Sequence, residues 1–166
     1  VYSGGGLGLL CYRITDGDTS VSGEITVPSQ HNGYPVTDIG DSAFAGCKEI
    51  TSVVISEGIE TIGSRAFQGC TALEKVFIPK TLKTTFSTPF AGCTSLNGVY
   101  ISDLAAWCNV SFSTRQGNPL LLAGNLYLNG ELVENLVFNE SITDIPDVAF
   151  FGCTSLKSVT FSDKTE

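Results

Sequence analysis

One five-residue motif recurs four times in this chain, and its spacing restricts the fold more than any other feature. The motif places a phenylalanine three residues before a cysteine that follows a glycine, and its copies occupy 43–47, 66–70, 89–93 and 149–153. The first three copies are 23 residues apart, and the fourth follows 60 residues after the third. A fixed period of this size is typical of a solenoid, in which each repeat contacts only its neighbours.

Each repeat contains a strand pattern and a turn pattern. Val76 and Ile78 are apolar residues with period 2, which predicts a strand with one buried face. The stretch 63–69 begins with a small residue that can cap a helix N-terminus, continues for only a few residues and ends at a glycine that can terminate a helix. This pattern predicts one or two helical turns. A single repeat is too small to stand alone, so the Phe and Cys columns are expected to stack as ladders through a shared core.

The ends of the regular region have their own patterns. Segment 25–28 matches 76–79, so the strand ladder is expected to begin there. Upstream, 9–14 and 19–22 flank Asp16-Gly17, which predicts a β-hairpin that caps the first repeat. In the third unit Thr85-Phe86 replaces the Ile-Gly pair, so its turn is expected to deviate locally.

An ordered insertion interrupts the period. The step from Val99 to Leu136 is 37 residues, which is 23 + 14. Within it, 102–108 predicts a capped short helix and 125–133 predicts a hairpin on an Asn-Gly turn. The expected organisation is one solenoid with a cap and first strand at 1–35, three regular repeats at 36–101, the insertion at 102–135 and a final repeat at 136–166, whose truncation the sequence leaves open.

Charge and hydropathy exclude several classes of partner. The net charge is −8 without any Lys/Arg cluster, which argues against nucleic acid and anionic membrane surfaces. No apolar run approaches the ~20 residues of a membrane span, so no membrane insertion is expected. The chain starts at Val1 and contains no Met, which favours a mature or excised fragment.

Four of the six cysteines occupy one repeat position that faces the core: Cys47, Cys70, Cys93 and Cys153. Strand spacing brings consecutive members within disulfide distance, but parallel side chains fit the disulfide dihedral poorly. A ladder of packed free thiols is therefore favoured, with a disulfide or a metal role left open. Zinc is disfavoured because no Cys-x-x-Cys or nearby His is present, and no cofactor is expected.

The pattern from Ile62 to Pro79, Ile-Gly-x-x-Ala-Phe-x-Gly-Cys-Thr-x-Leu-x-x-Val-x-Ile-Pro, resembles the BspA-type leucine-rich repeats of bacterial surface proteins. The insertion, with 103–108 and 125–132, is similar to a variant repeat of that family. The resemblance implies a leucine-rich-repeat solenoid on an exported or surface-attached protein with an extracellular location and an adhesive role. The family offers no catalytic residues to carry over.

One residue per strand is expected to point outward, between the two core residues. These positions form the row Thr26, Val54, Phe77, Tyr100, Val137 and Thr160, and the positions two residues earlier form a second row, Glu24, Ser52, Lys75, Gly98, Asn135 and Ser158. Neighbouring exposed aromatic residues on a solenoid sheet predict a ligand-binding surface, for which the candidates are Phe77, Tyr100, Lys75, Val54 and Val137. The alternative is cross-strand pairing that only stabilises the sheet.

These patterns favour a monomeric, non-catalytic binding or adhesion module that recognises a protein or glycan through its strand face. A structural spacer that presents another domain of a longer chain is the alternative. A glycan-active enzyme is disfavoured, because Glu24, Glu74 and Glu134 are too dispersed to nominate a carboxylate pair.

Overall fold

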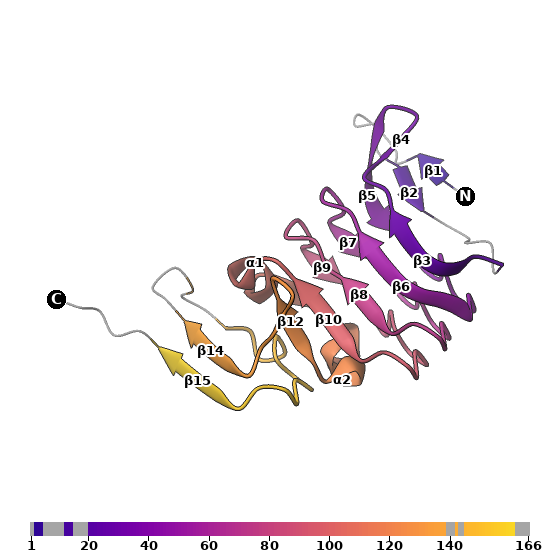
Figure 1. Ribbon diagram of the computed structural model, residues 1–166. Coiled ribbons are helices and arrows are strands. Elements are labelled where there is room, and N and C mark those ends of the chain that lie inside the picture. The colour runs from indigo at the N-terminus through magenta and orange to yellow at the C-terminus, as the bar shows by residue number, and fades with distance from the viewer. Residues whose placement is uncertain (1, 5–11, 15–19, 139–141, 143–144, 162–166) are drawn as a thin grey trace.

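The computed structural model describes residues 2–4, 12–14, 20–138, 142 and 145–161. The chain coils into a solenoid with two ladders of mainly parallel strands, and this confirms the fold class predicted from the 23-residue period (Figure 1). In chain order the elements are β1 (Tyr2–Gly4), β2 (Tyr12–Ile14), β3 (Ser22–Val27), β4 (Gln30–His31), β5 (Tyr34–Ile39), β6 (Glu49–Ile55), β7 (Thr61–Ile62), β8 (Lys75–Phe77), β9 (Thr84–Thr85), β10 (Gly98–Ile101), α1 (Leu104–Cys108), β11 (Ser111–Phe112), the 3-10 turn η1 (Arg115–Gly117), α2 (Leu120–Ala123), β12 (Leu126–Leu128), β13 (Glu131–Leu132), β14 (Asn135–Phe138) and β15 (Ser158–Phe161).

The main sheet carries the predicted strand ladder, in the order β13-β12-β10-β8-β6-β3. Its inward row is fully buried and pairs strand to strand: Val53, Val76, Val99 and Leu126. A second sheet, in the order β1-β2-β5-β7-β9-β11 with β4 on β5, runs along another side of the solenoid. The sequence patterns did not predict this second ladder, because strands such as β7 and β9 are only two residues long.

The segment between the two ladders forms hydrogen-bonded turns rather than α-helices. In the first repeat, alternate amides donate to the carbonyl oxygen three residues earlier, as in Cys47 N to Phe44 O at 3.2 Å. The intervening amides donate to the next repeat, as in Phe44 N to Ala66 O at 2.7 Å. The glycine of the recurring motif has φ of +79° at Gly46 and +74° at Gly69, a backbone region that glycine enters without steric cost.

The predicted core ladders of Phe and Cys are confirmed in the first three repeats. The ring of Phe67 lies between those of Phe44 and Phe90, with centroid distances of 5.2 Å and 5.4 Å and nearly parallel planes. The thiol of Cys70 donates to the carbonyl oxygen of Phe44 at 3.2 Å, and Cys93 repeats this bond to Phe67. Cysteine therefore recurs here as a small buried side chain that also supplies a weak hydrogen-bond donor to the preceding repeat.

The local deviation predicted for the third turn is wrong. Phe86 N donates to Ile62 O at 2.9 Å, just as Gly63 N donates to Ile39 O at 2.8 Å one repeat earlier. The backbone path is therefore conserved, and the substitution changes the side chain only. Phe86 does not join the core column either, because 45% of it is exposed.

The N-terminal pairing differs from the predicted hairpin. β2 pairs antiparallel with β1 and parallel with β5, whereas β3 begins the main sheet beside β6. Two antiparallel pairs, β1–β2 and β4–β5, lie at this end of the second sheet. The Asp16-Gly17 turn itself lies outside the described residues.

The insertion contains the predicted helix and hairpin. Asp103 caps α1 by accepting from the Ala106 amide at 2.9 Å, and β12 and β13 pair around Asn129 and Gly130, which have φ of +52° and +87°. The sequence analysis missed β11, η1 and α2. It also missed that β12 enters the main sheet directly beside β10, four residues later than a regular repeat would place it.

The last repeat is joined to the insertion through two buried side chains. Trp107 is 2% exposed, and its indole Nε1 donates to the carbonyl oxygen of Ala149 at 2.9 Å. Asn118 donates through Nδ2 to Val148 O and Ala149 O at 2.6 and 3.0 Å. Beyond this contact β14 and β15 form a separate two-stranded sheet (Figure 1). Val159 and Phe161 on β15 are 44% and 66% exposed, because no described strand follows β15.

Candidate binding surface

A continuous row of apolar side chains crosses the outer face of the main sheet. The register pairs Val54 with Phe77, Phe77 with Tyr100, Tyr100 with Tyr127, and Tyr127 with Leu132. Residues that are directly paired point to the same face, so these five form one stripe perpendicular to the strands. We call this row the aromatic stripe. Its four interstrand steps give it a length of about 19 Å at ~4.8 Å per step.

The three rings at the centre of the aromatic stripe stack on one another. The centroids of Phe77 and Tyr100 are 4.5 Å apart at an interplanar angle of 25°, and those of Tyr100 and Tyr127 are 4.4 Å apart at 6°. All three residues are partly buried. Because each ring covers the face of its neighbour, the stack presents mainly ring edges and the two tyrosine hydroxyls to solvent.

Gly98 makes room for the central ring of the stripe. A Cβ atom at Gly98 would lie 2.7 Å from Cε2 of Tyr100 and 3.3 Å from Cε2 of Tyr127. The two tyrosine rings therefore lie back along the strands, over the position of the missing side chain. A larger residue at 98 would push both rings away from the sheet.

The structure brings together four of the five predicted site residues and separates only Val137 from them. Val54, Phe77 and Tyr100 are consecutive in the stripe, and Lys75 is exposed beside it, two residues before Phe77 on the same face of β8. The predicted neighbour of Tyr100, Val137, is wrong: Val137 pairs with Thr160 in the separate sheet and is 63% exposed.

Sequence reasoning missed Tyr127 and Leu132 as parts of this surface. The signal that could have found Tyr127 is Leu126-Tyr127-Leu128, which has the same apolar-aromatic-apolar form as Val99-Tyr100-Ile101. Its assignment to a hairpin outside the ladder obscured this match. β12 is in fact both a hairpin strand and the next strand of the main sheet.

The Tyr100 hydroxyl of the stripe stays neutral at physiological pH. Burial raises the pKa of Tyr100 above its usual value, and the adjacent Tyr127 raises it further through charge repulsion and a hydrogen bond. The neutral Tyr100 hydroxyl can therefore both donate and accept hydrogen bonds at the surface of an otherwise apolar stripe.

Ser52 lies in the row beside the stripe, and its buried hydroxyl has no hydrogen-bond partner among the residues that the structure describes. The residue is 6% exposed. An unpaired buried hydroxyl costs about 1–3 kcal/mol, so Ser52→Ala should raise the free energy of unfolding by about 1 kcal/mol in urea denaturation. The matched control is Ser158→Ala in the equivalent row of the last sheet, where the hydroxyl does donate to Asn135 at 2.6 Å. A loss of stability in Ser52→Ala as large as in Ser158→Ala would contradict the assignment.

A groove of about 300 Å³ adjoins the stripe where the strands end. The rings of Phe77 and Tyr100 form one side, and the remaining lining comes from the strand ends and the β12–β13 turn: Ile55, Glu57, Ile78, Pro79, Ile101, Ser102, Asn129 and Gly130. This volume is at the lower limit of sites for small ligands, which span about 300–1,000 Å³. The groove therefore suits one side chain of a larger partner that lies on the stripe.

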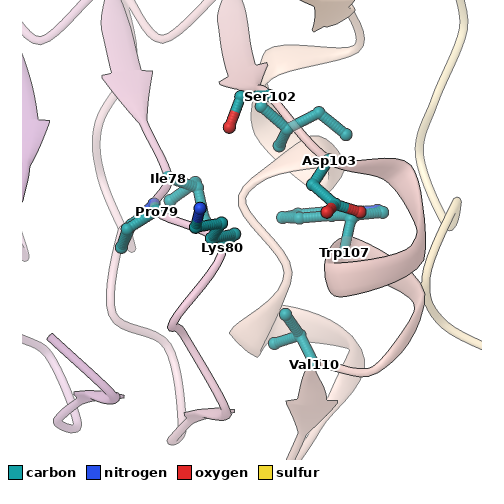
Figure 2. A pocket seen from close by; sticks show the side chains of 8 residues that line it. Ile78, Pro79, Lys80, Ser102, Asp103, Trp107 and Val110 are labelled. Carbon is teal, nitrogen blue, oxygen red and sulfur yellow. The ribbon is translucent and has the colours of Figure 1, made fainter. Parts of the chain in front are cut away.

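A second depression, beside α1, is already filled. Figure 2 shows Trp107 pointing from α1 toward Ile78 and Pro79, with Asp103 and Ser102 above it. The space between these side chains has a volume of about 0 Å³ for water-sized molecules. It is a packing seam of the insertion rather than a ligand site.

Four of the five described cysteines are buried. The hydrogen bond from Cys70 lowers the pKa of the Cys93 thiol, but Cys93 is only 1% exposed. Cys47, Cys70, Cys93, Cys108 and Cys153 are not in disulfides, and Cys11 lies outside the described residues. The adjacent Cys93 and burial raise the pKa of the Cys70 thiol, and burial raises the pKa of Cys108 to about 11. Within the described residues, no three or more His, Cys, Asp or Glu side chains gather in a way that could hold a metal ion.

Comparison with known proteins identifies the repeat. A family model described as the BspA type leucine rich repeat region matches residues 23–116 and 123–166 in six copies. The chain belongs to this family. BspA-type repeats are those of bacterial surface proteins, as the sequence resemblance implied. No curated protein matches the chain.

Solved structures of leucine-rich-repeat proteins share the fold. A leucine-rich-repeat protein of T. pallidum is similar, with a TM-score of 0.54 and 23% identity over 96% of this chain and 78% of that one. A leucine-rich cell surface protein of Faecalibacterium prausnitzii has a TM-score of 0.58 and 23% identity, over 99% of this chain and 38% of that one. A leucine-rich-repeat protein of Bacteroides ovatus has a TM-score of 0.51 and 23% identity, over 96% of this chain and 39% of that one. The chain thus spans less than half the length of the last two.

Among the described residues, no helix is long and apolar enough to cross a membrane.

Proposed function

We propose that this chain is a non-catalytic binding module of an exported, surface-attached bacterial protein, and that it recognises a protein partner through the aromatic stripe. The observation that carries the proposal is the unbroken pairing of Val54, Phe77, Tyr100, Tyr127 and Leu132 across five strands. Clustered aromatic and aliphatic side chains on a rigid sheet are typical of the central residues of protein interfaces.

The ring geometry favours a protein over a glycan at this surface. A sugar ring packs its CH face on the open face of an aromatic ring, but here Tyr100 has a neighbouring ring on each side, at 4.5 and 4.4 Å. The ring edges and hydroxyls that stay accessible match the apolar side chains and backbone polar groups of a polypeptide. An extended segment of about six residues would span the stripe at ~3.3 Å per residue.

A binding experiment tests this proposal. The purified chain is screened against immobilised extracellular-matrix and serum proteins, and each binder is retested with the variant Phe77→Ala/Tyr100→Ala/Tyr127→Ala. Loss of a central aromatic cluster should weaken binding at least about tenfold, with the melting temperature within a few degrees of the wild type, because the three rings lie outside the core.

The matched control is Phe86→Ala, which removes an exposed phenylalanine from the second sheet's side of the solenoid and should leave protein binding unchanged. Light scattering of the free chain checks the expected monomer. If every protein in the panel fails to bind, or binds the triple variant equally well, the stripe is a stabilising cross-strand row, and a spacer role explains the chain better. Binding of a glycan that the triple variant abolishes would contradict the class of partner.

A further inference from the structure

A small polar cleft opens where the second ladder meets the turns, away from the aromatic stripe. Its volume is about 190 Å³, room for about six water molecules at ~30 Å³ each. The C-terminal ends of β5 and β7 form its floor, and Phe86, directly after β9, forms a wall. We call it the Phe86 cleft.

The cleft exists because the repeat position that precedes the turn changes its residue. This position is Gly40 in the first regular repeat, Gly63 in the second and Phe86 in the third. Two side chains are thus absent from the floor, and Gly63 cannot be enlarged, because a Cβ there would lie 2.7 Å from the Asp41 amide and the Gly40 carbonyl carbon. The backbone path itself is the same in all three repeats.

Phe86 is a large apolar side chain at the edge of the cleft. It is 45% exposed, and no aromatic ring of the described residues stacks on it. This distinguishes Phe86 from Phe77, Tyr100 and Tyr127, whose rings stack on one another. The exposed part of the Phe86 side chain therefore offers hydrophobic surface to a ligand in the cleft.

Polar groups for hydroxyl recognition line the same cleft. Oδ1 of Asp41 accepts a hydrogen bond from the Ser64 amide at 2.7 Å, which fixes the carboxylate and leaves its other oxygen free to accept. The hydroxyls of Ser64 and Thr61 have no partner among the described residues, and each can donate and accept. Asp41 is the only charged residue in the lining.

We propose that the Phe86 cleft binds a single neutral pyranose residue. The apolar CH face of the sugar would pack on Phe86, while its ring hydroxyls would donate to Asp41 and exchange hydrogen bonds with Ser64 and Thr61. A cationic side chain fits less well, because ammonium and guanidinium groups only donate hydrogen bonds and would leave the hydroxyl donors of Ser64 and Thr61 unused, whereas sugar hydroxyls both donate and accept. The site is independent of the aromatic stripe and of its protein partner.

The test uses methyl glycosides of glucose, galactose, mannose and N-acetylglucosamine as probes. Each is titrated into the isotopically labelled chain, and the backbone amide resonances are followed by NMR. One glycoside is expected to shift the amides of residues 40–41 and 63–64 with a Kd in the millimolar range, as its small size dictates. Phe86→Ala should weaken this binding at least tenfold without loss of stability, since the side chain is exposed.

Two further variants separate the alternatives. Phe77→Ala/Tyr100→Ala/Tyr127→Ala should leave sugar binding unchanged, so that failure of the stripe proposal and of this one can be told apart. Asp41→Asn keeps an acceptor for Ser64 and should weaken sugar binding only a few-fold. The proposal is overturned if none of the four glycosides shifts these amides, or if tetramethylammonium shifts them and sugars do not.

Discussion

Replacing Phe67 with alanine should lower the free energy of unfolding by about 3–5 kcal/mol, as expected for deletion of a fully buried aromatic ring. The ring is in contact on both faces, with Phe44 at 5.2 Å and Phe90 at 5.4 Å between centroids. Its loss leaves a cavity at the junction of three repeats. Because each repeat is stable only through its neighbours, a defect in the middle one should also reduce the cooperativity of unfolding.

Urea denaturation followed by circular dichroism measures both effects, through the midpoint and the m-value. Phe86→Ala is the matched control, since the same side chain is removed from a position that is 45% exposed. It should change stability by no more than about 0.5 kcal/mol. A Phe67→Ala variant within about 1 kcal/mol of this control would show that the Phe ladder does not hold the repeats together.

Trp107→Ala should also lower the free energy of unfolding by about 3–5 kcal/mol, but we expect the loss of stability to be concentrated in the final repeat. Trp107 packs edge-on against Phe112 at 5.2 Å and donates to Ala149 O, so it joins the insertion to the final repeat. Its removal should therefore release β14 and β15 first. Hydrogen exchange of their amides should accelerate far more than exchange in β6 and β8.

The conservative variant Trp107→Phe distinguishes packing from hydrogen bonding. It keeps most of the ring volume and loses only the Nε1 donor, while Asn118 still donates to Ala149 O at 3.0 Å. We expect it to cost about 1–2 kcal/mol. Equal acceleration of exchange in all strands of Trp107→Ala would mean that the final repeat is not a separately coupled unit.

The sequence predicted the main ladder because two of its properties locate each strand. One is the alternation of apolar residues within the strand, and the other is the spacing in residues between successive copies of the repeat. Val53, Val76 and Val99 share both, and they pair as expected. The pairing of Leu126 with Val99 could not be read from the period, because the step is 27 residues and the segment also carries a hairpin signal. Both pairings occur together because β12 has two edges: one pairs in parallel with β10 and the other pairs in antiparallel orientation with β13.

The candidate site was predicted only in its centre, for the same reason. Phe77 and Tyr100 lie in repeats of regular length, so their contact follows from spacing alone. Tyr127 and Leu132 lie outside the regular spacing, and the assignment of their segment to a separate hairpin obscured the match of Leu126-Tyr127-Leu128 to Val99-Tyr100-Ile101. At Phe86 the sequence predicted a local deviation that the structure does not show. The hydrogen bond from Phe86 N to Ile62 O keeps the regular backbone path without the Ile-Gly pair, and this path leaves the Phe86 side chain exposed.

The antiparallel return of β13 along β12 has a mechanical consequence. In an uninterrupted solenoid, every strand presents a free edge on which the next one adds, and an outward row of side chains can lengthen with each copy. Here β13 occupies that edge, and pairing starts afresh at β14. The aromatic stripe therefore ends at Leu132 and has one fixed length. The length of a bound polypeptide that the stripe can contact is therefore limited at the β13 end.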